Sequence, residues 1–278
     1  MRDVKIVLGE TNNGPMLYIP TDAYVGRSLD LYGEFSAGEQ SLFDFVSQRG
    51  GAAIDVGANM GAHTMAMAKR YEHVFAFEPQ KTLHKLLCGN LSPFLNTTIY
   101  NAAVSNDESV IHFPDMDYSV PNNFGALGKA CFDDLPAEER ATINMTPVQV
   151  RVIDKCEAIQ ASEKISLIKV DVEGMEREVL EGARQTIAKH QPILYVENDK
   201  PKHSQALLDY IYNTLAYRAW WHITNLYNPA NFKQNSMNVY PEIVSFNIIC
   251  VPEGHWVDIQ GAQACTPQKP FVPEGCVT

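Results

Sequence analysis

The sequence has no long apolar run and little positive charge. No stretch of its 278 residues is long and apolar enough to span a bilayer. The first residues are charged and lack an apolar signal core, so we expect a cytoplasmic protein. Only 22 Lys and Arg oppose 33 Asp and Glu, and the net charge is −11. Surfaces that follow nucleic-acid phosphates have the opposite balance, so we expect neither a nucleic-acid nor a membrane partner.

Cysteine is present, but in none of the spacings typical of metal knuckles or redox pairs. The six residues are Cys88, Cys131, Cys156, Cys250, Cys265 and Cys276. Most have apolar neighbours, which predicts buried free thiols. The alternative for Cys265 and Cys276, in the Pro-rich tail, is a pair formed in an oxidising compartment.

The chain alternates between strand-like and helix-like segments from residue 52 onwards. The predicted strands are 52–56, 73–77, 98–104, 148–153, 167–172, 193–196, 219–224 and 243–251, with an extra strand as an option at 110–113. The predicted helices are 64–70, 82–91, 176–189 and 204–215. This alternation predicts an α/β fold in which helices cover both faces of a mostly parallel sheet.

The rest of the chain is predicted to elaborate one domain, 1–278. β-type runs at 4–8 and 16–19 flank a turn and predict an N-terminal hairpin. A lead-in helix follows within 21–50. Residues 114–147 are rich in Pro, Asn, Asp and Gly, which predicts an insertion or lid. The tail, 253–278, has no clear period and is expected to be irregular.

A glycine-rich turn joins the strand at 52–56 to the next helix. Gly57 can take positive φ, and Gly61 allows helix and strand to approach closely. The free N–H groups of a helix start suit the anionic or polar end of a ligand. Similar turns occur as plain packing corners and in dinucleotide enzymes, so this turn alone does not identify a ligand.

Polar and acidic residues recur at the carboxyl ends of the predicted strands, where such sheets bind ligands. In strand order they are Asp55, Glu78, Asn101, Asp171 with Glu173, and Glu197 with Asn198. A single carboxylate at such a place can simply cap the next helix, as Asp171 and Glu173 would. Several together favour a crevice that binds cations or hydroxyl groups.

Glu78 follows the glycine turn by one helix and one strand, the position of a carboxylate that binds ribose hydroxyls. The alternative is an exposed loop acid before Pro79. The turn lacks the middle glycine that lets a backbone approach pyrophosphate, so a nucleoside without phosphates fits better. S-adenosylmethionine is such a molecule. Its ribose would meet Glu78, its amino-acid end the turn, and its sulfonium the acidic crevice.

Four motifs resemble the FkbM-type family of S-adenosylmethionine-dependent methyltransferases. They are IDVGANMG at 54–61, FEP at 77–79, IKVDVEGME at 168–176 and EGA at 181–183. Lesser similarities are YGEF at 32–35 with Glu39, VID at 152–154, NLYNPANF at 225–232 and SFN at 245–247. The resemblance extends over residues 21–252.

The resemblance implies a Rossmann-like class I methyltransferase sheet whose last strand is antiparallel. It implies S-adenosylmethionine as cofactor and a hydroxyl of a sugar or other small natural product as methyl acceptor. By motif position the methionine end would meet Asp55, Gly57, Asn59 and Gly61, the ribose Glu78, and the adenine Asn101 and Ala102. Glu34, Thr64 and Asp171 are further expected cofactor-binding residues.

Methylation of a hydroxyl needs a base, or a metal that lowers the pKa of that hydroxyl. The catalytic candidates are Asp171, Glu173 and Glu197. Asp171 is expected at the ammonium end of the donor, whereas Glu173 or Glu197 orients or deprotonates the acceptor. His63 and His222 are alternative bases, although a packed neutral ring and a strand residue, respectively, are favoured for them.

A magnesium site is the less favoured alternative. Asp171, Glu197 and Asn198 occupy the positions at which catechol-type O-methyltransferases hold Mg²⁺, and their oxygens suit that ion. We expect no bound metal, and Mg²⁺ is the alternative to test.

Two other functions compete with methyl transfer. An NAD(P)-dependent oxidoreductase would use the same corner, but the missing middle glycine and the acidic strand ends disfavour it. A non-catalytic nucleoside-binding protein would not need Asp171 and Glu173. The acceptor pocket is expected from the least patterned stretches, 21–40, 114–147 and 225–241.

Overall fold

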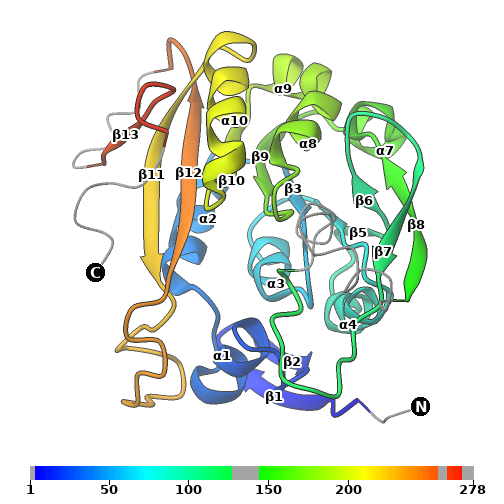
Figure 1. Cartoon of the computed structure of the whole chain (residues 1–278), viewed down its shortest axis with the longest axis vertical. Helices are drawn as coiled ribbons and strands as arrows, with labels where there is room; N and C mark the ends of the chain where they lie inside the picture. Colours follow the sequence, from blue (N-terminus) through cyan, green and yellow to red (C-terminus); the bar gives the residue numbers. More distant parts are fainter. Residues whose placement is uncertain (1–3, 127–143, 256–261, 271–278) are drawn as a thin grey trace.

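The computed structural model describes residues 4–126, 144–255 and 262–270. Their central sheet has the strand order β13-β11-β12-β10-β9-β3-β4-β5 (Figure 1). In that order the strands are β13 (Ala264–Cys265), β11 (Tyr217–Asn225), β12 (Val244–Pro252), β10 (Ile193–Glu197), β9 (Ile165–Val170), β3 (Ala52–Val56), β4 (Val74–Phe77) and β5 (Thr97–Tyr100). No helix within these ranges has both the length and the apolar composition needed to cross a bilayer.

The direction of the strands creates a crevice at the centre of the sheet. Strands β5, β4, β3, β9 and β10 are parallel, whereas β12 is antiparallel to both β10 and β11. The prediction of a mostly parallel sheet with an antiparallel last strand is therefore confirmed. From β3 the chain proceeds outward through β4 and β5, then returns to the other side of β3 as β9. Such a reversal leaves a ligand crevice beyond the carboxyl ends of β3 and β9.

Helices cover both faces of the sheet, as the alternation predicts. One face packs on α2 (Ala37–Ser47), α3 (Ala62–Ala68) and α4 (Lys81–Leu91). The other packs on α7 (Glu157–Gln160), α8 (Glu176–Gly182), α9 (Arg184–His190) and α10 (Pro201–Asn213). Side chains alternate between the two cores along each strand: Ala53 belongs to the first and Ile54 to the second. Because both faces are buried, the sequences of the parallel strands are nearly continuous apolar runs.

The N-terminal hairpin is present, with a shorter turn than expected. Strand β1 (Val7–Thr11) pairs with β2 (Gly14–Tyr18), so only two residues form the turn. With α1 (Val25–Tyr32) it lies at the lower end of the molecule in Figure 1. Asn90 of α4 attaches it to the glycine turn: its amide donates to the carbonyls of Leu17 and Met60, at 2.9 and 2.8 Å.

A small sheet lies beside the main one, in the order β6-β8-β7. Its strands are β6 (Ala103–Val104), β7 (Val110–Pro114) and β8 (Met145–Arg151), and a 3₁₀ turn, η1 (Ile153–Lys155), follows. The predicted strand 98–104 is thus divided at residues 101–102, and the predicted strand 148–153 starts earlier and ends at Arg151. The ends of the expected insertion, 114–147, lie in β7 and β8, whereas 127–143 lie outside the described residues.

The expected irregular tail contributes β13, which pairs with β11. Part of that tail, 256–261 and 271–278, lies outside the described residues. Cys88, Cys156, Cys250 and Cys265 are free thiols, and all except Cys88 are buried. Cys131 and Cys276 also lie outside the described residues.

The single helix expected at 176–189 is wrong, because the structure divides it at Ala183 into α8 and α9. Gly182 packs against the backbone of Ser105, where a Cβ would lie 2.1 Å from the carbonyl oxygen. Asp154 then caps the start of α9. Its carboxylate accepts the N–H groups of Gln185 and Thr186 at 2.7 and 2.8 Å. Both partners are distant in sequence, so helical periodicity does not reveal the break.

Replacing Asp154 with alanine is expected to lower the free energy of unfolding by about 1–2 kcal/mol, the usual cost of a lost helix cap. Urea denaturation of Asp154→Ala against the wild type measures this, with the exposed Glu163→Ala as a control. Equal stability of the two Ala variants would contradict the capping role.

Candidate functional site

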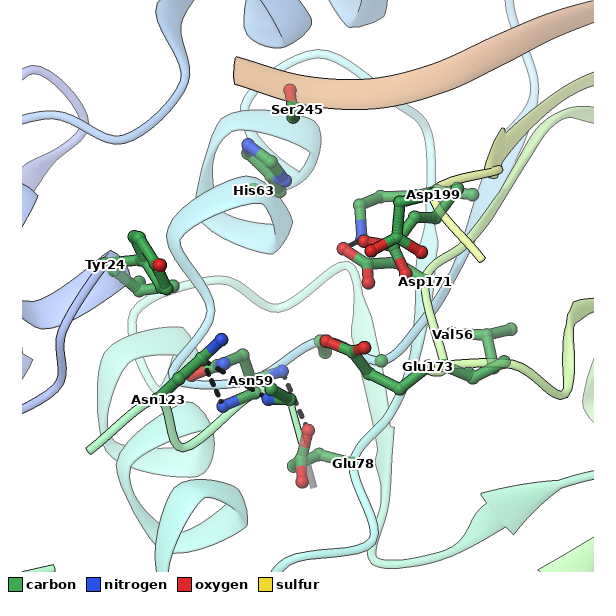
Figure 2. A pocket seen from close by; sticks show the side chains of 18 of the residues that line it. Tyr24, Val56, Asn59, His63, Glu78, Asn123, Asp171, Glu173, Asp199 and Ser245 are labelled. Atoms are coloured by element: carbon green, nitrogen blue, oxygen red, sulfur yellow. Dashed lines mark hydrogen bonds and ion pairs between the residues drawn. The ribbon is translucent and has the colours of Figure 1, made fainter. Parts of the chain in front are cut away.

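An open cavity of about 360 Å³ lies at the carboxyl edge of the sheet, above β3, β4, β9 and β10 (Figure 2). This volume is within the range of about 300–1,000 Å³ typical of small-molecule sites. Its floor consists of the glycine turn and the strand ends. Its walls come from α1, α2, residues 123–126 and residues 243–247.

The glycine turn has the conformation that its sequence predicts. Gly57 has φ +85°, and a Cβ there would lie 1.9 Å from the carbonyl oxygen of Asp171, so no other residue fits. Asn59 also has positive φ, and its N–H donates to Oε2 of Glu78 at 2.9 Å. Gly57 and Asn59 line the cavity, whereas Gly61 packs against Leu87 outside the lining.

Glu78 is a buried carboxylate in the cavity wall, so the alternative of an exposed loop acid is wrong. The residue is only 3% exposed. One oxygen accepts the N–H of Asn59, and the other accepts the N–H of Gln80 at 2.7 Å. Burial raises its pKa to about 7, although both hydrogen bonds act in the opposite direction. Each oxygen has further lone pairs with which to receive ligand hydroxyls.

An apolar slot lies beside Glu78. It is lined by Phe77, Ala102, Val104, Ile111, Phe113, Val172 and Met175. Asn101 does not line it: its amide donates to the carbonyls of Glu78 and Pro79 at 2.9 and 3.1 Å. Asn101 therefore holds the turn that presents Glu78. Ile111 and Phe113 belong to β7. The sequence does not reveal that this strand lies beside the main sheet.

Lys169 is a buried cation beneath the centre of the cavity, and the sequence analysis missed it. It is 2% exposed, and its Nζ lies 3.2 Å from Oδ2 of Asp171 and 3.6 Å from Oδ1 of Asp55. Burial lowers the pKa of Lys169, but Asp171, Asp55 and Glu39 together raise it above its ordinary value. A charged residue inside an apolar strand, two positions before Asp171, was the signal that could have identified it.

Asp55 and Thr64 lie below the cavity and do not line it. Thr64 donates its hydroxyl to Oδ2 of Asp55 at 2.6 Å. This hydrogen bond joins α3 to the end of β3. They therefore support the cavity floor through Lys169, which does line the cavity.

Glu39 and His63 form the wall of the cavity on the α2 and α3 side. Glu39 is 3% exposed, and its Oε1 accepts the hydroxyls of Ser36 and Ser245 at 2.7 and 2.8 Å. Burial raises its pKa. The ring of His63 packs edge-on against Phe43, with centroids 5.2 Å apart. Burial, and then Lys169, lower the pKa of His63 to about 4, so the ring is neutral at physiological pH.

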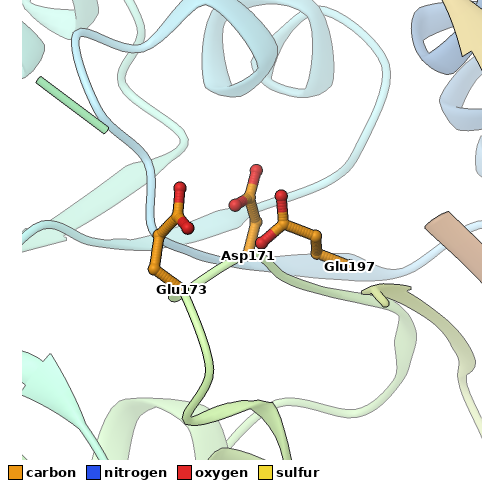
Figure 3. Close-up of side chains that lie close together, drawn as sticks. All are labelled: Asp171, Glu173 and Glu197. Carbon is orange, nitrogen blue, oxygen red and sulfur yellow. The ribbon is translucent and has the colours of Figure 1, made fainter. Parts of the chain in front are cut away.

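Three carboxyl groups converge at the ends of β9 and β10 (Figure 3). Oxygens of Asp171, Glu173 and Glu197 all lie within 4.8 Å of one another. Burial and the neighbouring acids raise the pKa of Glu173 to about 7 and that of Glu197 well above its ordinary value. Lys200 lies 2.7 Å from Oε2 of Glu173 and also contacts Asp199.

The residues that could bind a magnesium ion in this structure differ from the set that the sequence predicts. Asn198 points away from the acidic group, and its amide lies 3.7 Å from Sγ of Cys265 and 3.4 Å from the carbonyl of Pro270. The available oxygen donors are therefore Asp171, Glu173 and Glu197, with Glu173 already paired to Lys200.

Two further candidates lie outside the cavity lining. Glu34 accepts the amide of Asn228 at 2.8 Å and the N–H of Phe232 at 3.0 Å, so it anchors the loop after β11. Nδ1 of His222 lies 3.0 Å from the hydroxyl of Tyr195. The cavity brings together the predicted residues Gly57, Asn59, Glu78, Ala102, Asp171, Glu173 and Glu197. It does not include Glu34, Asp55, Gly61, Thr64, Asn101 or Asn198.

The roof of the cavity comes from two of the stretches expected to build an acceptor pocket. Residues 21–40 contribute Tyr24 and Phe35, and 114–147 contribute Asn123. The stretch 225–241 contributes only Leu226, because residues 243–247 take its place. Gln80 holds the roof by donating its amide to the carbonyl of Phe124 at 2.7 Å.

Comparison with known proteins supplies a family match. A model of the methyltransferase FkbM domain matches residues 55–219. No curated protein matches the chain. Among solved structures, the methyltransferase FkbM of Methylobacillus flagellatus KT has 16% identity and a TM-score of 0.44, over 72% of this chain and 43% of that one. This chain therefore spans less than half of that protein's length.

Two other solved structures show similar values. The precorrin-6y C5,15-methyltransferase of Geobacter metallireducens GS-15 has 11% identity and a TM-score of 0.44, over 76% of this chain and 87% of that one. TYW2 of M. jannaschii, in complex with AdoMet, has 10% identity and a TM-score of 0.42, over 90% and 87%.

The raised pKa of Glu78 predicts a pH-dependent effect of Glu78→Gln on the ligand-free protein. Between pH 4.5 and about 7 the folded state retains a proton that the unfolded state releases. The contribution of Glu78 to stability is therefore largest below pH 4.5 and is lost as pH rises to about 7.

We subtract the unfolding free energy of Glu78→Gln from that of the wild type. This difference should fall by roughly 1–3 kcal/mol between pH 5 and pH 8. Urea denaturation of the wild type and of Glu78→Gln at each pH measures it. A constant difference for Glu78→Gln would show that its pKa is ordinary.

Proposed function

Because the chain belongs to the FkbM methyltransferase family, we propose that it transfers the methyl group of S-adenosylmethionine to a hydroxyl of a sugar or other small natural product. The observation that carries the proposal is the buried carboxylate of Glu78, held toward the cavity beside the glycine turn. A carboxylate in this place suits the two ribose hydroxyls of a nucleoside.

The cavity residues fit the three parts of S-adenosylmethionine. The ribose would lie at Glu78, and the adenine in the apolar slot next to it, which includes Ile111 and Phe113. The methionine end would lie along Gly57 and Asn59 toward Asp171. The negative charge of the strand ends suits the positive sulfonium.

S-adenosylmethionine supplies an activated methyl group whose bond to sulfur breaks as the bond to the acceptor oxygen forms. The residues of this chain align the acceptor, exclude water and receive its proton. Glu173 is the proposed base, because a pKa near 7 suits proton transfer at neutral pH. Glu197, more strongly protonated, would orient the acceptor hydroxyl. We propose that no metal is required, because Lys200 already neutralises Glu173.

The acceptor is proposed to enter from the side of Tyr24 and Asn123. These residues and Leu226 give that part of the cavity a mixture of apolar and amide surface. Such a surface suits a neutral hydroxylated molecule, with stacking on the aromatic ring and hydrogen bonds to the amide. The net charge of −11 favours a neutral or cationic small molecule over a nucleic acid.

Calorimetry should show that S-adenosylmethionine binds and NAD does not. Glu78→Gln removes the charged partner of the ribose hydroxyls, so its affinity for S-adenosylmethionine should be about 10- to 100-fold lower. The exposed Glu72→Gln should bind as the wild type does. NAD binding without S-adenosylmethionine binding would overturn the proposed function.

Glu173→Gln and Glu197→Gln should retain the affinity for S-adenosylmethionine. Their methylation rate, measured with a labelled donor on acceptors from a cell extract, should fall about 10²- to 10⁴-fold. Unchanged rates would exclude both residues from catalysis. The wild-type rate should be the same in excess chelator, and loss of activity there would instead support the magnesium alternative.

A further inference from the structure

We propose that Glu39, Asp171 and His63 form an ammonium cage that binds the α-amino group of S-adenosylmethionine. The inference rests on the proposed function, because it takes S-adenosylmethionine as the donor. It adds two residues of the α2 and α3 wall, Glu39 and His63, to a cofactor site otherwise assigned to the glycine turn and strand ends. All three residues line the same cavity, in which Figure 2 shows His63 and Asp171.

The ionisable groups below this wall carry more negative than positive charge. Three carboxylates, Glu39, Asp55 and Asp171, surround the single ammonium of Lys169, and each of them raises the pKa of that lysine. Nζ of Lys169 is directed to Asp55 and Asp171, within 3.6 and 3.2 Å. The hydrogen-bond donors to Glu39 are neutral hydroxyls, those of Ser36, Ser245 and Tyr195. A buried carboxylate with neutral donors gains most from a cation beside it.

His63 provides an independent sign of a missing ligand. The residue is only 7% exposed, yet its Nε2 has no hydrogen-bond partner among the described residues. Buried polar atoms are rarely left unpaired, because their desolvation costs free energy that only a partner restores. The ring is fixed between Phe35 and Phe43, with both centroid distances at 5.2 Å, so it cannot turn to find another partner without repacking.

The protonation of the imidazole determines which ligand group it accepts. The backbone of Phe35 acts on the ring in the way that raises its pKa, which favours the proton of the neutral imidazole on the nitrogen that faces Phe35. The unpartnered Nε2 is then the nitrogen with the free lone pair. It must accept a hydrogen bond, and a ligand carboxylate or phosphate cannot donate one.

A primary ammonium satisfies all three residues together. It has three N–H donors, and the cage offers two carboxylates and one imidazole lone pair. The positive charge offsets the excess around Lys169, whereas a carboxylate in the same place would increase the repulsion. The α-amino group of the donor is the ligand that fits this cage, because the glycine turn and Glu78 would hold the rest of that molecule in the same cavity.

The test compares two ligands in the full-length protein by calorimetry. The first is S-adenosylhomocysteine, and the second is its desamino analogue, in which hydrogen replaces the α-amino group. The wild type should bind S-adenosylhomocysteine about 10- to 100-fold more tightly, because the analogue leaves charged hydrogen bonds unmade. Equal affinity for the two ligands would overturn the ammonium cage.

Variants assign the effect to the cage residues. Glu39→Gln and His63→Leu should each weaken S-adenosylhomocysteine binding about 10-fold and leave the affinity for the desamino analogue within about 2-fold. Equal losses for both ligands would indicate a general structural defect and overturn the assignment. Glu72→Gln and His84→Leu, both outside the cavity, are the matched controls.

The outcomes distinguish this inference from the proposed function. If the wild type binds neither ligand, the proposed function fails and the cage fails with it. If both ligands bind equally well, the nucleoside site stands and only the cage fails. Should Glu39→Gln not fold, His63→Leu still decides the matter, because binding of the desamino analogue reports an intact cavity.

Discussion

The ion pairs of Lys169 with Asp55 and Asp171 are the contact on which the site depends. Lys169 lies on β9 directly opposite Asp55 of β3, so the pairs join the two strands at the point where the sheet reverses its order. A buried charge group of this kind is stable only while it is complete, because removing one partner leaves another charge unpaired. Asp55 also binds Thr64, and Asp171 approaches Gly57, so α3 and the glycine turn are positioned by the same group.

The sequence was sufficient to predict most of the fold, and seven of the thirteen predicted site residues line the cavity. Strand and helix order follows from periodicity, and the antiparallel last strand follows from family resemblance. The α8–α9 break was not predictable, because Asp154 and Ser105 cause it from afar. The prediction that site residues lie at the strand ends was correct. Adjacent residues of a strand point to opposite sides, however, so Glu197 faces the cavity and Asn198 does not.

The ligand-free cavity contains more carboxylates than it can pair. Glu78, Glu173 and Glu197 all have raised pKa values, chiefly because burial penalises the charged form. A fold under selection for stability alone would not retain them, since each costs free energy at neutral pH. Their arrangement makes sense if a cationic ligand with several hydroxyl groups completes the site, which is the chemistry of the proposed donor.

One turn, residues 78–80, connects the wall of the cavity to its roof. Glu78 and Gln80 are two residues apart: the first faces the cavity, and the second holds the roof at Phe124. Asp22 receives the N–H of Phe124 from the other side, at 3.1 Å. The turn thus connects the carboxylate in the cavity wall directly to the roof beside Asn123. Because the roof borders the proposed acceptor entrance, this turn joins the wall that holds Glu78 to the surface proposed for the acceptor.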